Sequence, residues 1–260
     1  MKLFILFAIL TGSVYAAPVE NTSAPELIKR GFFIPKDSIA SVRAGYEGDF
    51  VADARMQQHE WGSGRVDSYT QETNSGTVTL NFINRIDLYG LVGSSRTCAD
   101  WRFTTNGDVH RAQLETLYNF LWGIGARGIL YKSECFALGM GGRFEHSKYD
   151  NLWMTIDGAV QKANHTELHW RVWQIDLDVS YKIDLFTPYI GVKYSNVRSG
   201  VGIFSVPISK SGTGVNCFRN RTPVGVFIGC SLSSGRYFML NIEGRLIDEE
   251  AVTISGDFRF

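Results

Sequence analysis

The sequence predicts an all-β protein that crosses a membrane as an antiparallel up-and-down β-barrel of about ten strands, with twelve also open. Three observations carry this prediction. Apolar and polar residues alternate with a period of two over most of the chain, as in strands with one apolar and one polar face. Many of these segments are about ten residues long, which suits a tilted membrane-spanning strand. Long polar connections and tight turns alternate along the chain, as in outer-membrane barrels.

The composition agrees with this class and excludes others. Lys and Arg together number 26, as do Asp and Glu, so the formal charge is zero and gives no reason to expect nucleic acid as a partner. The 44% hydrophobic content is too high for a disordered chain and too low for a bundle of membrane helices. The 27 glycines and 13% aromatic residues suit many strands and turns.

The first residues predict export. A basic start and an apolar run at residues 3–10 precede Ala16, which ends a stretch that suits signal-peptide cleavage. We expect residues 1–16 to be a signal peptide cut after Ala16, because the apolar run is far shorter than the ~20 residues that span a bilayer. Residues 17–37 contain three prolines and no clear period, which predicts a loose periplasmic N-terminal arm. The barrel is expected over residues 38–260.

Alternating segments cover most of the remaining chain. The expected strands are residues 43–53, 77–82, 86–92, 121–131, 136–144, 173–181, 188–194, 224–232, 238–246 and 252–260. The long polar outer loops are residues 54–75, 95–117, 148–167 and 200–222. Tight periplasmic turns are expected at residues 84–85, 132–134, 183–184 and 233–235. The outer connection at 248–250 is short, and a hairpin hidden in 200–222 would raise the count to twelve strands.

Alternation by itself does not separate a membrane barrel from a soluble sheet with one buried face. Hydrocarbon cannot hydrogen-bond the backbone, so a spanning sheet must close on itself with its apolar face outward. Aromatic residues near strand ends favour the membrane barrel, because they match the girdles of membrane–water interfaces. These residues are Trp122, Phe144, Trp173, Tyr181, Tyr194 and Phe258. The last expected strand ends in Phe260, and a terminal aromatic is similar to the assembly signal of outer-membrane barrels.

Charged residues occupy the opposite face, which we expect to line the lumen. The candidate pore-lining residues are Arg43, Glu47, Asp49, Asp53, Asp87, Arg127, Arg143, Glu145, Asp176, Asp178, Lys182, Lys193, Glu243, Arg245, Asp257 and Arg259. Their mixed signs predict no strong ion selectivity. Interior side chains already fill a barrel of about eight strands, so ten strands predict a narrow pore, or one closed by ion pairs across the lumen.

The motifs give no sign of catalysis, a metal or a cofactor. His165 and His169 have a spacing that binds metal on a helix, but here they lie where a loop meets a strand, and we expect them to be solvated. Some barrel proteases use Asp and His at the outer rim. Asp108 and His110 fall in an outer loop of this chain without a nucleophile beside them. We therefore expect neither enzymatic activity nor a bound cofactor.

The four cysteines divide between the two ends of the expected barrel. Cys98 and Cys217 fall in outer loops, whereas Cys135 and Cys230 fall near the periplasmic rim. A disulfide needs Cα atoms within about 7 Å. The barrel wall separates the outer loops from the periplasmic rim, so a cysteine at one level cannot bond to a cysteine at the other. Cys98 and Cys217 are the candidate internal disulfide, since an export compartment permits one. Cys135 and Cys230 lie four strands apart and are candidates for free thiols or for bonds to another chain.

Several sequence blocks are typical of one bacterial family. The most specific are GARGILYKSECFALGMGGRFEHSK at 125–148, FTPYIGVK at 186–193 and GRLIDE followed by the final FRF in 244–260. With these blocks the chain resembles the chlamydial major outer membrane protein family over residues 41–260, as a shorter variant with reduced outer loops. The resemblance implies porin activity, a structural role through disulfide cross-linking, with Cys135 at a family cysteine position, and a homo-oligomer, trimeric by resemblance.

The sequence thus predicts a porin-like barrel in contact with outer-membrane lipid, which lets small solutes diffuse and contributes to the cell envelope. Two alternatives stay open. One is a closed structural or adhesive barrel whose surface loops are the working part, and the other is a soluble secreted barrel that binds apolar ligands inside. The orientation of the wall decides between membrane and soluble barrels. The apolar row at 173–179 must face outward while Asp176 and Asp178 face the lumen.

Overall fold

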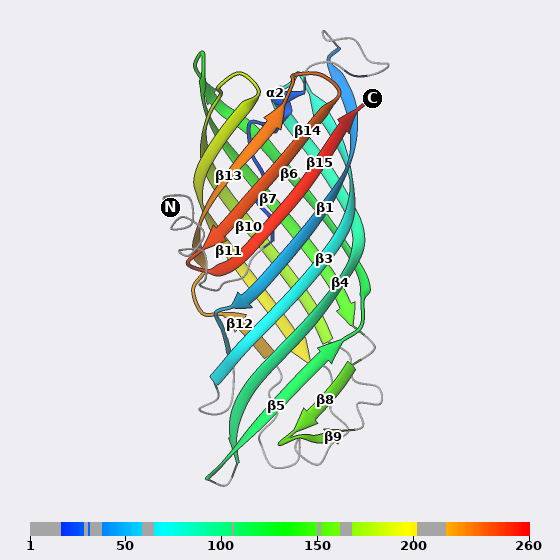
Figure 1. Cartoon of the computed structure of the whole chain (residues 1–260), viewed down its shortest axis with the longest axis vertical. Coiled ribbons are helices and arrows are strands. Elements are labelled where there is room, and N and C mark those ends of the chain that lie inside the picture. The colour runs from blue at the N-terminus through cyan, green and yellow to red at the C-terminus, as the bar shows by residue number, and fades with distance from the viewer. Residues whose placement is uncertain are drawn as a thin grey trace, which may run out of the picture.

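The structure, a computed structural model of the chain, describes residues 17–28, 31, 38–58, 65–105, 107–149, 152–161, 168–201 and 217–260. A closed antiparallel ring of 10 strands forms the barrel wall (Figure 1). Each wall strand corresponds to one of the strands expected from the sequence. They are β1 (Ala40–Ala54), β3 (Arg65–Phe82), β4 (Ile86–Thr105), β6 (Asn119–Lys132), β7 (Phe136–Tyr149), β10 (Leu168–Tyr181), β11 (Phe186–Val201), β13 (Val224–Ser233), β14 (Phe238–Leu246) and β15 (Glu249–Arg259).

Successive wall strands are neighbours, and β1 closes the ring by pairing with both β3 and β15. Tyr46 of β1, for example, lies opposite Gly76 on one side and Gly256 on the other. Closure leaves no unpaired strand edge in the wall, as a hydrocarbon environment requires. Within the stretch 200–222, the described residues after β11 form only the short β12 (Cys217–Asn220), which pairs with β11 and β2 instead of adding a hairpin to the ring. The prediction of about ten strands is therefore confirmed.

The outward face of the wall is apolar. Along β10, Trp173, Ile175 and Leu177 are 42%, 50% and 41% exposed, whereas Asp176 and Asp178 between them are 3% and 1% exposed. The six aromatic residues predicted at the interfaces also lie on this face, exposed or half-buried. The orientation that a membrane barrel requires is thus confirmed, which excludes a soluble barrel with the same row inside.

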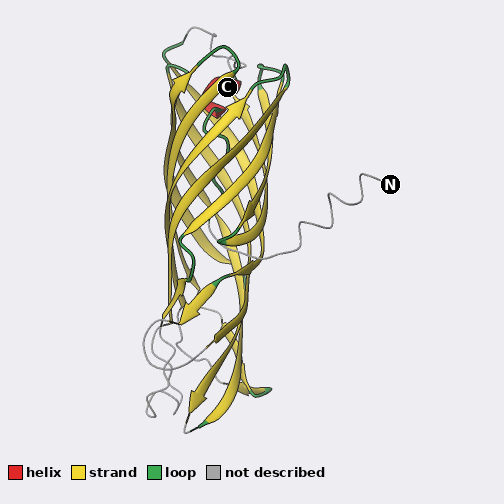
Figure 2. Ribbon diagram, turned by 90° about the vertical axis from the view of Figure 1, so that its left-hand side faces the viewer, coloured by secondary structure: helices red, strands yellow, loops and turns green. Residues whose placement is uncertain are grey.

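Several strands continue beyond the apolar wall as an extension at the long-loop end (Figure 2). The sequence was expected to form loops here, but β3 begins at Arg65, β4 runs to Thr105, and a strand β5 follows. The extension is completed by β2 (Met56–Gln58), β5 (Asp108–Thr116), β8 (Leu152–Ile156) and β9 (Ala159–Gln161). Its outward residues face water and many are charged, such as Arg102 beside the buried Trp101. The sequence here therefore lacks the apolar outward row of a membrane strand, and it was predicted as loop.

Tight turns join the strands at the opposite end, as predicted for the periplasmic side. Ile83 and Asn84 both have positive φ angles, 48° and 51°, which a two-residue hairpin turn of the primed type requires. The described helix α2 (Ala24–Leu27) has 4 residues and lies at this end, inside the barrel (Figure 1). None of the helices in the described ranges is long and apolar enough to cross a bilayer.

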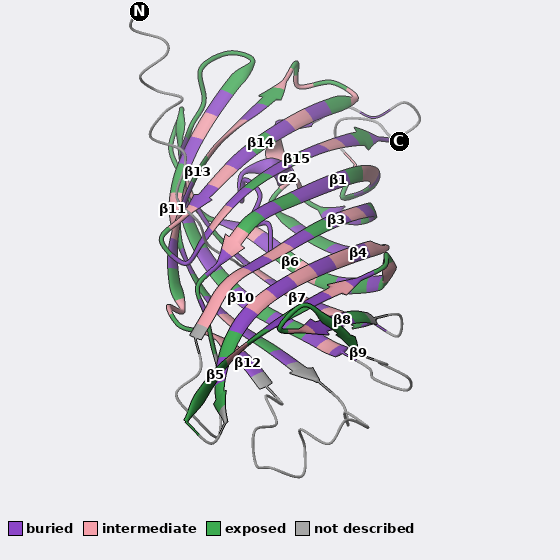
Figure 3. Cartoon of the chain, turned by 60° about the horizontal axis from the view of Figure 1, so that its bottom comes forward, coloured by how far each residue is buried: buried purple, intermediate pink, exposed green. Residues whose placement is uncertain are grey.

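The interior of the barrel is filled in two different ways. Figure 3 shows the alternation of buried and exposed residues that turns one side of each wall strand inward. Toward the long-loop end, buried apolar side chains form what we call the outer cluster. Its larger members include Tyr69, Leu91, Trp101, Phe103, Leu114, Leu121, Tyr149, Met154, Leu168, Trp170, Val172, Val197 and Phe218. Toward the short-turn end, the interior holds charged wall residues and residues 17–28, which we call the inserted segment.

Candidate pore lining and the inserted segment

Most of the predicted pore-lining residues point into the barrel and are buried there, none more than 5% exposed. They are Arg43, Glu47, Asp49, Asp87, Arg127, Arg143, Glu145, Asp176, Asp178, Lys193, Glu243, Arg245, Asp257 and Arg259. Side chains along an open, water-filled pore would be accessible to water. The burial of these residues therefore describes a closed lumen, as the small strand number predicts.

Two of the predicted residues do not line the lumen. Lys182 is exposed in the connection after β10, because the strand ends at Tyr181 and the alternation ends with it. Asp53 is half-buried at the outer rim, next to a bulge in β1. Its carboxylate accepts hydrogen bonds from the backbone N–H groups of Ala54 (2.9 Å) and Tyr69 (3.0 Å). Simple alternation does not anticipate a bulge or the end of a strand.

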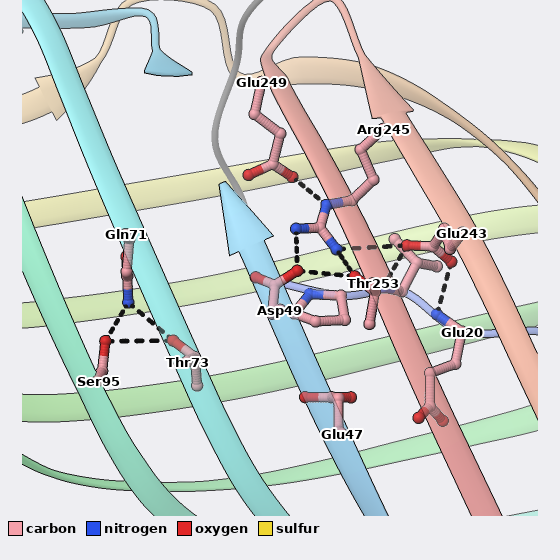
Figure 4. A network of polar contacts seen from close by, with 12 residues as sticks. Glu20, Glu47, Asp49, Gln71, Thr73, Ser95, Glu243, Arg245, Glu249 and Thr253 are labelled. Carbon is pink, nitrogen blue, oxygen red and sulfur yellow. Dashed lines mark hydrogen bonds and ion pairs between the residues drawn. The ribbon is translucent and has the colours of Figure 1, made fainter. Parts of the chain in front are cut away.

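The first charge network centres on Arg245 of β14 (Figure 4). Its guanidinium contacts Asp49 of β1 at 2.7 Å and Glu249 of β15 at 2.7 Å. The hydroxyl of Thr253 donates to the same Asp49 oxygen at 2.7 Å. Lys193 of β11 joins the network by pairing with Glu249. Four wall strands are thus connected across the interior by ion pairs that leave no unpartnered cation among them.

A second network of ion pairs centres on Arg143 of β7 and connects this strand to β1. Arg143 of β7 donates to both oxygens of Glu47 on β1, at 2.9 and 2.6 Å, and also pairs with Glu145. The two-pronged bond fits the planar guanidinium to the carboxylate and spans the lumen between strands that are not neighbours. One carboxylate oxygen of Asp87 on β4 pairs with Arg43 of β1 and also with Arg127, which lies opposite it on the neighbouring strand β6.

Sequence reasoning missed three lumenal acids, Asp248, Glu249 and Glu20. Asp248 and Glu249 belong to the short outer connection between β14 and β15, yet they are 1% and 0% exposed. Asp248 lies 3.3 Å from the amine of Lys193. The short length of this connection could have revealed their position, because a tight turn keeps its side chains at the level of the wall, where they can face the lumen. Glu20 was also missed, since it lies in the expected periplasmic arm.

The inserted segment differs most from the expectation of a loose periplasmic arm. Residues 17–28 lie inside the barrel, and every side chain except that of Glu26 is buried. The backbone N–H groups of Val19 and Glu20 donate to the two oxygens of Glu243 at 3.0 and 2.9 Å (Figure 4). The N–H of Thr22 donates to Asp178 at 3.1 Å. The segment has no period of its own, because its backbone groups and the side chains of consecutive residues such as Asn21 and Thr22 all bind the wall.

Further wall groups bind the carbonyl oxygens of the segment. Gln174 donates to Pro18 at 2.9 Å, Arg43 to Ala24 at 2.9 Å, Asn81 to Pro25 at 3.2 Å and Ser233 to Leu27 at 3.0 Å. Ion pairs join Glu20 to Arg127 and Glu26 to Lys132. Apolar contacts are few by comparison. They include Val19 with Tyr189 and Phe227, Ala24, Leu27 and Ile28 with Met239, and Ala17 with the outer cluster.

Gly139 of β7 makes room for the inserted segment. A Cβ atom added there would overlap the side chain of Thr22. The glycine therefore relieves crowding between β7 and the segment at this position.

The cysteines are free thiols where their side chains are described. Cys98 lies on the outward row of β4, between Arg96 and Asp100, and its thiol is unpaired. The side chain of Cys217 lies outside the described residues, so the pairing of these two cysteines stays a proposal. Cys135 is exposed in the turn before β7, and Cys230 is half-buried on β13.

The histidine and aspartate considered for catalysis lie in the extension. His110 of β5 contacts Asp157, with 2.7 Å between its Nδ1 and the carboxylate. Asp157 also accepts a hydrogen bond from the backbone N–H of Arg111 at 2.9 Å, and both bonds hold the pKa of Asp157 below its usual range. The pair joins β5 to the β8–β9 turn. Within the described residues, no group of three or more side chains is arranged to hold a metal ion.

Together, the closed ring, the apolar outer face with aromatic ends and the charged interior define an integral β-barrel of the outer membrane. The chain resembles the chlamydial major outer membrane protein family. The family model described as "Chlamydia major outer membrane protein" matches residues 151–213. Among curated proteins, a major outer membrane porin of Chlamydia pneumoniae is 24% identical, over 98% of this chain and 97% of its own. The serovar H porin of Chlamydia trachomatis is 22% identical, over 100% of this chain and 99% of its own.

The alignment with the Chlamydia pneumoniae porin extends over 376 positions, more than the 260 residues of this chain, so that protein carries stretches that this chain lacks. Solved structures with some likeness include the COG4313 outer membrane channel from Pseudomonas putida F1 (TM-score 0.44, 9% identity, 86% of this chain and 96% of that one). Another is OprG from Pseudomonas aeruginosa (TM-score 0.37, 10% identity, 90% and 99%).

Proposed function

We propose that the protein is a porin-like barrel that passes small solutes across the outer membrane when the inserted segment leaves the lumen. The observation that carries this proposal is how the segment is held. Its bonds to the wall are mainly hydrogen bonds and ion pairs, which water replaces at little net cost once the lumen is hydrated. The resemblance to proteins named as porins supports the same function, and no catalytic step is part of it.

Departure of the segment would change the charge of the lumen. Glu243 and Asp178 accept hydrogen bonds from backbone N–H groups of the segment, and no described cation pairs with Asp178. Without the segment these carboxylates would face the pore. Arg143 and Arg245 stay paired with acids of the wall, and Arg127, which loses Glu20, keeps its ion pair with Asp87. The open lumen would therefore carry an excess of uncompensated negative charge and favour small cations.

Conductance in a planar bilayer tests the proposal. We expect rare, brief openings from the full chain and sustained openings, with preference for K⁺ over Cl⁻, from a variant that lacks residues 17–28. A matched pair of cysteines supplies the control, because Ser23 contacts Ser180 of β10. The variant S23C/S180C, built with the four native cysteines replaced by serine, should be silent when oxidised and conduct like the full chain after reduction.

A closed structural barrel is the second candidate function. The outer cluster favours it, because packed apolar side chains also block the lumen at the long-loop end. The rings of Trp101 on β4 and Phe218 on β12 meet edge to face, 5.4 Å apart, across this region. If the variant without residues 17–28 gives no discrete conductance steps, the channel proposal is wrong and the structural barrel takes its place.

A contribution to the cell envelope belongs to the same proposal. Cys135 is exposed in a periplasmic turn, where a second copy or another envelope protein can reach its thiol. We expect a homo-oligomer, trimeric by resemblance, with disulfide-linked species that survive electrophoresis without reductant. The C135S variant should lose these species, whereas C98S should keep them. Equal cross-linking in both variants would contradict a role for Cys135.

A further inference from the structure

Four basic side chains form a row across neighbouring strands on the outer surface of the barrel. His146 of β7 lies opposite Arg171 of β10, Arg171 opposite Arg198 of β11, and Arg198 opposite Arg219 of β12. We call these four residues the cationic row. All four lie on the outward side of their strands, since the residues beside them along the chain, such as Val172 and Val197, are buried. With about 4.8 Å between strands, the row is about 14 Å long.

The cationic row lies directly above the upper edge of the apolar belt. On β10 the outward residues run from Tyr181 to Trp173, and Arg171 is the next outward position. Eight residues at about 3.3 Å each, in a strand tilted by about 40°, give about 20 Å of height, close to the ~25 Å apolar band of outer-membrane barrels. On β11, Asn196 lies opposite Trp173 and stands between Tyr194 and Arg198 on the outward side, so Arg198 is at the level of Arg171. The rings of Trp173 and Tyr194 pack 5.5 Å apart just below the row.

This position is the headgroup level of the outer leaflet. The row faces sideways, toward the surrounding lipid, and it stands at the long-loop end of the wall. Aromatic girdle residues lie at the membrane–water interface, so the next outward side chain reaches the lipid headgroups.

The three arginines of the row have no acidic partner among the described residues, in contrast to the other side of the barrel. On β3–β5, outward arginines are paired, for instance Arg102 with Asp67 at 2.6 Å and Arg111 with Asp100. In the described part of β7, β10, β11 and β12, no acidic side chain faces outward beyond the aromatic level. Arg171 and Arg198 form no ion pair with any described residue, although like charges opposite each other destabilise a sheet. An anion bound between the two guanidinium groups would remove this repulsion.

We propose that the cationic row binds the phosphate groups of an outer-leaflet lipid, with the acyl chains of that lipid lying along Trp173, Ile175 and Leu177. Arg171 and Arg198 hold one phosphate between two guanidinium groups, the geometry that suits two-pronged phosphate binding. The row is long enough for a second phosphate at Arg219 or His146, which favours a glycolipid with two phosphates over a phospholipid with one. This inference does not depend on whether the lumen conducts.

The geometry also argues against other occupants. A second copy of the chain that met this surface with the same row would bring like charges together in a region of low dielectric constant. A soluble polyanion would approach from above, but the row lies on the side of the wall, at the level where lipid surrounds it.

Lipid retention tests the proposal. The folded protein would be placed in phosphatidylcholine nanodiscs that contain a bisphosphorylated lipid A, its dephosphorylated form or phosphatidylglycerol, and bound lipid would be measured by native mass spectrometry. We expect the bisphosphorylated lipid to bind most tightly. The variant R171Q/R198Q should bind it about 30-fold more weakly, since each basic residue at a membrane surface contributes about a factor of five to ten. The binding should weaken with added salt.

Matched variants keep the result interpretable. R102Q/R111Q removes two outward arginines that already have acidic partners and should leave lipid binding unchanged. R171K/R198K keeps the charge and should restore most of the binding, which separates charge from a general loss of structure. Equal retention by the wild type and R171Q/R198Q would overturn the proposal, as would equal retention of the phosphorylated and dephosphorylated lipids. Competition by soluble heparin as strong as that by lipid would also overturn it, by assigning the row to an aqueous polyanion.

Discussion

The two ends of the lumen are closed by different kinds of contact. At the long-loop end, the outer cluster packs apolar side chains from several wall strands and from β12. At the short-turn end, the inserted segment is held by hydrogen bonds and ion pairs to charged wall residues. Apolar packing opens only when its area is exposed to water, whereas polar contacts exchange with water at small net cost. The comparison teaches that the inner end is the one suited to reversible opening.

The largest effect is expected when a charge is removed from the network at the inner end. Arg143→Met leaves Glu47 and Glu145 buried without their cation, which should lower the free energy of unfolding by about 3–5 kcal/mol. Urea titration of the barrel in detergent micelles measures this change. Arg85→Met, in an exposed turn, is the control and should change stability by less than about 0.5 kcal/mol. A similar loss in both variants would show that the buried network is not what distinguishes the inner end.

A truncation in the outer cluster tests the other closure. Phe218→Ala removes the ring that meets Trp101 and should cost about 3 kcal/mol through lost apolar contact and the cavity left behind. Because β12 is short, we expect the loss to appear as earlier opening of the long-loop end, visible in hydrogen exchange of β2 and β12. Combined with deletion of residues 17–28, it should increase conductance beyond either change alone. If the combined variant conducts no more than the deletion of residues 17–28 alone, the outer cluster is not a barrier in the lumen.

A single added methyl group sharpens the comparison at the inner end. Gly139→Ala should push Thr22 away from β7, at a cost of about 1–2 kcal/mol to the bound state of the segment. We therefore expect more frequent openings in the planar bilayer, with an unchanged conductance per opening. Gly142→Ala is the matched control, because this glycine lies on the outward side of the same strand and has no contact with the segment. More frequent openings in the control would contradict displacement of the segment as the cause.

The smallest effect concerns pH and the ion pairs on the outward face of the extension. Hydrogen bonds from Arg111 lower the pKa of Asp100, and contacts with His110 and Arg111 lower that of Asp157. Because both folded pKa values are depressed, their stabilisation is complete above the usual pKa of about 4 and disappears as the pH falls through the folded values. We expect pepsin to cut the β5 and β8–β9 region increasingly below about pH 4. In the D157N variant, part of this pH dependence should be lost, while the membrane wall stays protected in both proteins.

The wall could be predicted from the sequence because every wall strand repeats the same arrangement, an apolar row toward lipid and a polar row toward the lumen. A row such as Trp173 to Tyr181 must face lipid, and this fixes the strand, its orientation and the inward position of Asp176 and Asp178 between them. The same rule placed most of the charged lining. It failed at Asp53, where a bulge interrupts the alternation, and at Lys182, which lies beyond the end of the strand.

The filling of the lumen could not be predicted in this way. The inserted segment binds through backbone groups and through successive polar side chains such as Glu20, Asn21 and Thr22, so its sequence carries no period that reveals the contact. The lumenal positions of Asp248 and Glu249 depend on how low the wall is at β14 and β15, which is a property of the whole ring. The extension was concealed for a related reason, since its outward residues face water and break the pattern that marks a lipid-facing strand.

The unequal heights of the wall strands give the barrel an asymmetric mouth. β4 has 20 residues and β14 has 9, so at about 3.3 Å per residue one side stands tens of ångströms longer than the other along the strands. The β14–β15 turn forms the low side of the rim (Figure 1). A solute or an antibody arriving from outside the cell meets the tall β3–β5 side as a shield and reaches the lumen over the low side. The acids Asp248 and Glu249, in and beside the β14–β15 turn, therefore stand at the low side of the rim.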